Sequence, residues 1–159
     1  MFEWLRGKPR EIKHDENTEK FYSRLEADTL ARTIFGEAGG KSIILKEAIA
    51  NVVLNRVAFA KKRKNYWWGN NVIQVCQKPY QFPCWNRSDP NFNKLQRATA
   101  ANDLEFSECL TISYHALRGE LPDHVHGSTH YHLENTHPYW ARHETPMAII
   151  EGHHFYKLS

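Results

Sequence analysis

"TIFGEAGG", residues 33–40, marks the place where the first predicted helix ends. The apolar side chains of residues 30–35 recur at the three-and-four spacing of one helix face. The pair Gly39–Gly40 then favours a helix stop, because glycine tolerates the left-handed conformation of a C-cap. Glu37 falls in the last turn, where negative charge is unfavourable by about 0.3–1 kcal/mol. Something other than helix stability is therefore expected to keep this acid in place.

The elements around this stretch predict an α+β domain with a helical majority and a small antiparallel sheet near the C-terminus. Asp28 is a candidate N-cap for the first helix, and Ser42 for a central, largely apolar helix that follows. Further on, we expect a basic aromatic loop, a short helix, an irregular proline-rich segment, two helices, a strand, and two strands about a Glu151–Gly152 turn. These lie at 61–71, 71–76, 77–90, 91–102, 105–118, 125–133 and 146–158, respectively.

Composition is typical of one folded domain. The chain has 159 residues, of which 41% are hydrophobic and 13% aromatic, and these fractions argue against disorder. Residues 1–20 are read as a flexible polar arm and 21–159 as a single catalytic domain. The net charge of +3 is too small to indicate nucleic-acid binding by itself. The three cysteines, Cys76, Cys84 and Cys109, are read as buried free thiols.

No apolar run approaches the ~20 residues of a membrane span, and the first residues lack the apolar core of a signal peptide. Synthesis in the cytoplasm without a signal peptide, and no stable membrane insertion, are therefore expected.

Glu37 is the first candidate for chemistry. An acid in partly apolar surroundings holds its proton to higher pH, as general-acid cleavage of a glycosidic bond requires. On its position alone, a solvated surface glutamate remains the alternative.

Five motifs in order give this residue a context. They are LARTIFGEAGG, EAIANVVLNRV, YQFPCW, GSTHYH and IIEGHHFY, beginning at Leu30 and ending at Tyr156. In this combination the chain resembles the SleB-type cell-wall hydrolases, the spore-cortex-lytic enzyme family that also occurs in bacteriophages.

The resemblance implies a lysozyme-like domain that cleaves peptidoglycan between N-acetylmuramic acid and N-acetylglucosamine, most simply as a lytic transglycosylase. Glu37 would protonate the leaving oxygen and then take a proton from the muramic acid 6-hydroxyl, which closes a 1,6-anhydro ring. Neither a cofactor nor a metal is implied, and the partner is the glycan strand, acted on by a monomer.

The resemblance also assigns supporting residues. Tyr131 would donate to charge that develops near the cleaved bond. A second set would bind substrate: Gln81, Phe82, Trp85, Ser128, Thr129, His130 and Trp140. Since neighbours on a strand point to opposite faces, either His130 or Tyr131 is expected to be structural. Asn55 and Arg56 are read as a pair that holds the fold, because a buried arginine needs a bonded partner.

The chain departs from the family pattern after the glycines. Lys41 stands where the family usually has an acid, and Lys46 where it often has glutamine. Lys41 makes the surroundings of Glu37 more positive, which would lower the pKa of the carboxyl. If the enzyme instead used water and a second carboxylate, Asp123, Glu134 and Glu144 are the candidates.

Other function classes stay open. His130 and His132 share one strand face, as in zinc-dependent amidases and peptidases of the cell wall, with a third ligand to come from the remaining histidines. These are His124, His126, His137 and His143. A non-catalytic glycan-binding protein using Tyr80, Trp85 and Trp140 is a further alternative. A nucleic-acid role for the basic loop at 61–68 is weaker, since such a loop suits anionic cell-wall polymers equally.

The expected setting is a phage endolysin, bacteriolytic once released from the cytoplasm to the periplasm or cell wall, or a virion-associated lysin.

Overall fold

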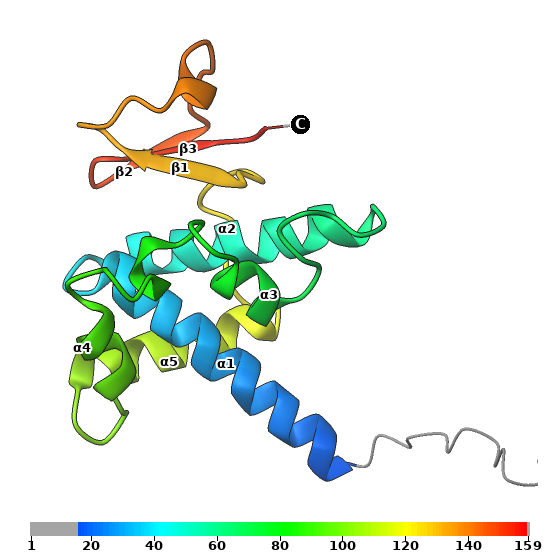
Figure 1. Ribbon diagram of the computed structural model, residues 1–159, viewed down its shortest axis with the longest axis vertical. Helices are drawn as coiled ribbons and strands as arrows, with labels where there is room; N and C mark the ends of the chain where they lie inside the picture. The colour runs from blue at the N-terminus through cyan, green and yellow to red at the C-terminus, as the bar shows by residue number, and fades with distance from the viewer. Residues whose placement is uncertain (1–15, 159) are drawn as a thin grey trace, which may run out of the picture.

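A computed structural model describes residues 16–158 of the chain. Helices form most of it, and a small sheet forms a separate layer at one end of the long axis, with α2 lying beneath it (Figure 1). The helices are α1 (Glu16–Ala38), α2 (Ile43–Lys61), α3 (Val72–Gln77), α4 (Phe92–Arg97) and α5 (Leu104–Leu117), with short 3-10 turns η2 (Pro83–Trp85) and η3 (Tyr139–Ala141). The predicted α+β class with a helical majority is confirmed.

Helix α1 is longer than the sequence indicated. It begins at Glu16, where acidic residues in the first turn favour the positive end of the helix dipole. Asp28 lies inside the helix and accepts a hydrogen bond from Arg32 at 2.8 Å, so its assignment as the N-cap was wrong. Residues 16–20 of the predicted arm are helical, and residues 1–15 lie outside the described residues.

Helix α2 is the central element, as predicted. The Ser42 hydroxyl caps it by accepting a hydrogen bond from the backbone N–H of Leu45 at 3.2 Å. Leu45, Ile49 and Val52 are fully buried where α2 packs against α1 and α5. Each such aliphatic side chain contributes about 1.5–3 kcal/mol when removed from water, so this helix anchors the core.

The segments after α2 follow the predicted order with shorter helices. α3 is capped by Asn71, whose side chain accepts from the Gln74 N–H, and the proline-rich segment is irregular apart from η2. The helix predicted over 91–102 ends at Arg97, because the Asn102 side chain accepts from the Thr99 N–H at 2.8 Å and shapes a turn there.

The sheet has three antiparallel strands in the order β1-β3-β2: β1 (His130–Leu133), β2 (Ala148–Ile150) and β3 (His153–Tyr156). The predicted Glu151–Gly152 turn is confirmed, with φ values of 45° and 75° that match a primed hairpin turn. The predicted strand over 125–133 starts only at His130, because Asp123 accepts the N–H groups of Val125 and Gly127 and folds that stretch into a turn.

The three cysteines are free and buried, as predicted. Among residues 16–158, no helix combines the length and apolarity needed to cross a membrane.

Candidate active site

Glu37 lies in the last turn of α1, where close packing brings η2 against the helix. A Cβ added to Gly36 would lie 2.4 Å from Cys84 Cβ, so only glycine lets Cys84 approach so near. Gly40 ends the region with a positive φ of 78°, and its N–H donates to Glu105 at 2.7 Å. The glycines around Glu37 therefore serve to place other groups beside it.

The Glu37 carboxyl is unusual for a helix-end acid. Its Oε1 is buried and has no hydrogen-bond partner among the described residues. Burial raises the pKa of Glu37, and hydrogen-bonding groups of Tyr131 and Cys84 oppose this rise only in part, while the charge of Asp89 adds to it. The carboxyl thus keeps its proton to higher pH than an ordinary glutamate, and Glu37 is not a fully solvated surface residue.

Tyr131 approaches Glu37 from the sheet. It pairs with Phe155 in the β1–β3 register, and its ring lies 5.6 Å from the Phe155 ring and 6.5 Å from that of Phe82, centroid to centroid. Burial and the Glu37 charge raise the pKa of Tyr131 well above its usual value. Its phenol therefore remains a neutral O–H donor beside the carboxyl.

Arg56 links α2 to the segment that leads into β1, near Tyr131 and Glu37. Its Nε donates to the Thr129 carbonyl at 2.7 Å, and Asn55 Nδ2 donates to the Ser128 carbonyl at 3.0 Å. The two residues hold the segment that leads into β1, so their predicted role as a fold-holding pair is confirmed. Arg56 Nη1 is buried without a hydrogen-bond partner among the described residues, and the arginine charge acts on both Tyr131 and Glu37. The effect of the Arg56 charge on these two residues was not predicted from the sequence.

The predicted substrate-binding residues divide by exposure. Phe82, Ser128 and Thr129 are buried, so they offer little surface to a ligand, contrary to their expected role. Gln81 and Trp85 are half-buried in the loop around η2, and Trp85 Nε1 donates to Thr33 Oγ1, one helical turn before Glu37. These two retain surface that a ligand can contact.

His130 points away from Tyr131, as strand alternation predicts. Its Nδ1 lies 2.8 Å from Thr129 Oγ1, and its ring contacts those of Trp68 and Trp140. Burial, with the Arg56 charge, lowers the pKa of His130 to about 4, so the ring is neutral at neutral pH. Trp140 packs its ring on His130 and His132 and is 36% exposed, so it keeps surface that a ligand can contact.

The zinc alternative finds no cluster in the part of the chain that the structure describes: no group of three or more His, Cys, Asp or Glu side chains is arranged to hold a metal ion. His132 instead bonds the Tyr156 hydroxyl through Nε2 at 2.8 Å.

A second carboxylate near Glu37 comes from an unexpected place. Asp123 binds backbone N–H groups of its own loop, Glu134 lies against Gly152, and Glu144 is exposed; none of the three is among the charges that shift the Glu37 pKa. Asp89, which follows η2, is among these charges, and it raises the Glu37 pKa. Asp89 and Cys84 were missed because only the fold of the proline-rich loop brings them to α1.

A cleft of about 310 Å³ opens beside Glu37 between the end of α1 and α4. Lys41 and Glu105 line it together. Glu105 also pairs with the buried Lys46, which in addition bonds Glu108 at 2.7 Å. The positive charges noted in the sequence are thus partly balanced, and the expected lowering of the Glu37 pKa does not occur.

Residues 40–156 match the family model named Cell Wall Hydrolase. The chain belongs to the cell wall hydrolase family. This membership confirms the resemblance found in the motifs and the expectation of an enzyme of cell wall degradation. The matched range begins after Glu37, so the assignment of that residue rests on its surroundings.

Two solved structures share the fold. The catalytic domain of the Bacillus cereus SleB protein aligns with a TM-score of 0.64 at 20% identity, over 84% of this chain and 91% of that one. The catalytic domain of the germination-specific lytic transglycosylase SleB from Bacillus anthracis aligns with a TM-score of 0.61 at 21% identity, over 83% and 93%. No protein of curated function matches the sequence.

Proposed function

We propose that this cell wall hydrolase is a lytic transglycosylase that cleaves the bond from N-acetylmuramic acid to N-acetylglucosamine, with Glu37 as both acid and base. The observation that carries the proposal is the buried Glu37 carboxyl, whose pKa is raised and whose Oε1 is unpaired within the described chain. The Bacillus anthracis relative is described as a lytic transglycosylase, in agreement with this reaction class.

In the first step the protonated Glu37 gives its proton to the glycosidic oxygen. The bond from muramic acid C1 to that oxygen breaks, and the N-acetylglucosamine 4-hydroxyl leaves. Positive charge develops at C1, and the Glu37 carboxylate that remains stabilises it.

In the second step the same carboxylate takes the proton of the muramic acid 6-hydroxyl. The 6-oxygen attacks C1 and closes the 1,6-anhydro ring, which returns Glu37 to its acid form. Tyr131 suits this cycle, because a neutral phenol donor stabilises the carboxylate between the two proton transfers. Arg56 adds a fixed positive charge.

Mass spectrometry of the soluble products of purified sacculi tests the reaction. Transglycosylation yields 1,6-anhydromuramic ends, which are one water lighter than reducing ends. Reducing muramic acid ends would instead indicate hydrolysis, with Asp89, whose charge acts on Glu37, as a candidate carboxylate for activating water. Peptides released from intact glycan strands would indicate an amidase or peptidase.

The setting is proposed as that of a monomeric endolysin of a phage, which reaches the periplasm or cell wall after release, or of a virion-associated lysin. The net charge of +3 supports binding to anionic walls without indicating nucleic acid. Clearing of a suspension of outer-membrane-permeabilised cells by added protein, together with its sedimentation as a monomer, tests this setting.

A further inference from the structure

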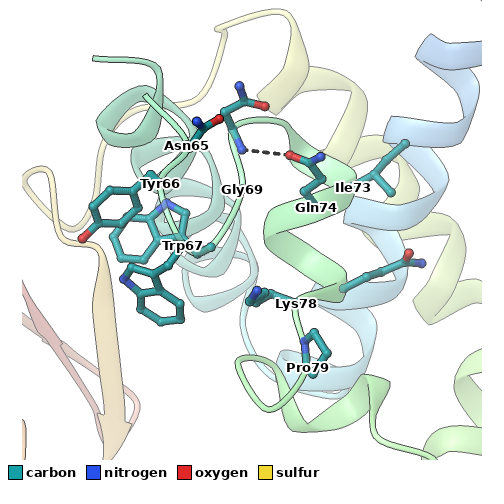
Figure 2. Close-up of a pocket in the computed structure, with 11 residues that line it drawn as sticks. Asn65, Tyr66, Trp67, Gly69, Ile73, Gln74, Lys78 and Pro79 are labelled. Carbon is teal, nitrogen blue, oxygen red and sulfur yellow. Dashed lines mark hydrogen bonds between the residues drawn. The ribbon is translucent and has the colours of Figure 1, made fainter. Parts of the chain in front are cut away.

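A pocket away from Glu37 combines aromatic and amide side chains. It has a volume of about 650 Å³ and lies where the loop after α2 meets α3. In Figure 2, Tyr66 and Trp67 stand on one side, Ile73 and Gln74 on the other, and Lys78 and Pro79 close one end. The remaining polar groups are carboxamides, from Asn65, Asn70 and Gln77. None of the described residues that line the pocket is acidic.

The walls of this pocket are held before any ligand arrives. The Asn70 N–H donates to Gln74 Oε1 at 3.0 Å, drawn as the dashed line in Figure 2. Gly69 has a φ of 88°, and a Cβ there would lie 2.4 Å from Gln74 Cβ, so the loop closes tightly on α3. Beneath it, Trp68 Nε1 donates to the Arg56 carbonyl at 3.0 Å.

Trp67 remains 50% exposed on this fixed loop. A large flat apolar face kept in water beside several carboxamides is a composition typical of a ligand site. A sugar ring presents apolar C–H faces and, around its edge, hydroxyl and acetamido groups. Carboxamides offer both donors and acceptors to such groups, and Lys78 tolerates the acidic peptides that peptidoglycan carries.

The pocket continues along the surface toward Trp85. A second depression of about 410 Å³ shares Gln77, Lys78 and Pro79 with it and extends to Trp85. Trp85 bonds α1 one turn before Glu37, and its neighbour Cys84 lies against the carboxyl. A glycan strand that leaves Glu37 on the side of Trp85 would follow this depression to the aromatic loop.

We propose that this pocket is a distal subsite, which binds one N-acetylated sugar of the strand that Glu37 cleaves. The inference rests on the proposed function. Its consequence is that the enzyme prefers long strands, because short fragments cannot occupy both places.

Binding is measured in a Glu37→Gln background, so that cleavage does not consume the ligand. Trp67→Ala should raise the dissociation constant for solubilised, uncleaved glycan strands by about three- to tenfold, the size expected for one aromatic face. Trp67→Phe should keep most of the affinity. Phe21→Ala, at a similarly exposed aromatic residue on α1, should leave the dissociation constant for glycan strands unchanged. Equal affinities for the Trp67→Ala and parent proteins would overturn the subsite.

A second readout needs no substitution in the pocket. In Glu37→Gln, addition of the β-1,4-linked N-acetylglucosamine tetramer should shift the Trp67 indole N–H resonance, and an unmoved resonance at saturating tetramer would overturn the subsite. A failure of the proposed function is distinguished from a failure of the subsite by product analysis. If the proposed function is wrong, the products of sacculi show no glycosidic cleavage, whatever the binding data show.

Discussion

The Tyr131 phenol and the Glu37 carboxyl act on each other in opposite directions: Tyr131 lowers the pKa of Glu37, and Glu37 raises that of Tyr131. Both shifts have one cause, because a neutral O–H next to a carboxylate favours the charged acid and the uncharged phenol. Burial dominates at both groups and keeps each pKa high. A strand residue and a helix-end residue, 94 positions apart in the sequence, thus influence each other's protonation.

Tyr131→Phe should lower turnover of sacculi by about 10–1000-fold, the range for loss of a donor to developing charge. Removal of one hydroxyl leaves the ring packed on Phe82 and Phe155, so the melting temperature should change little. Tyr139→Phe, at an 85% exposed tyrosine, is the matched control. Unchanged turnover would reduce Tyr131 to a packing residue and move suspicion to Thr129 or His130.

The pH dependence of kcat/KM should reflect Glu37. Because the acid form starts the reaction, activity should fall as the pH rises through the raised pKa of this carboxyl. Tyr131→Phe removes a group that lowers this pKa, so the residual activity should fall at a higher pH than in the parent. A descending limb that moves to lower pH in this variant would contradict the assigned interaction.

Gly36→Ala should destabilise the protein. Alanine in place of a helical glycine normally stabilises by about 0.5–1 kcal/mol, but here the new methyl meets Cys84 Cβ at 2.4 Å. Overpacking of this kind costs about 1–3 kcal/mol of unfolding free energy. Because the new methyl group would also push Cys84 away from Glu37, activity should fall as well. Urea denaturation measures the effect. Ser23→Ala, on the exposed part of the same helix, should stay within about 0.5 kcal/mol of the parent, and a stabilised Gly36→Ala would show that η2 can move without cost.

Chelator treatment should leave activity within about twofold, because the proposed proton transfers need no metal-activated water. Complete loss that added zinc restores would revive the metallo-amidase alternative built on His130 and His132.

The parts of the fold that local signals determine were predictable. The Ser42 cap, the apolar face of α2 and the Glu151–Gly152 turn each depend on residues close in sequence. The start of α1 was not predicted from the sequence, because residues 16–27 lack a clear apolar face and Asp28 has the sequence features of an N-cap. The end of α4 was also missed, because a side chain–backbone bond at Asn102 competes with the helix.

For the candidate site, Glu37 and Tyr131 were proposed from motifs, while the electrostatics of the two residues depend on tertiary contacts. Asp89 and Cys84 reach Glu37 only because Gly36 lets η2 approach α1. Phe82 and Thr129 were expected to bind substrate, but both are buried: Arg56 donates to the Thr129 carbonyl and lies over the Phe82 ring. A motif indicates that a residue matters without saying from which side it acts.

Stability against pH gives the Glu37→Gln variant a second signature. The folded pKa of Glu37 is raised above its ordinary value of 4.5, so the folded state binds more protons between the two values, and the parent loses stability as pH rises through them. Glutamine does not titrate. The melting temperature of Glu37→Gln relative to the parent should therefore rise from acidic to neutral pH.

The most direct measurement is the turnover of purified sacculi by Glu37→Gln at neutral pH, taken together with its melting temperature. Glutamine keeps the outline of the side chain but cannot give or take the proton, so turnover should fall by at least about 10²–10⁴-fold. The melting temperature should be equal to that of the parent or higher. Normal turnover by a folded Glu37→Gln protein would contradict the acid–base role of Glu37.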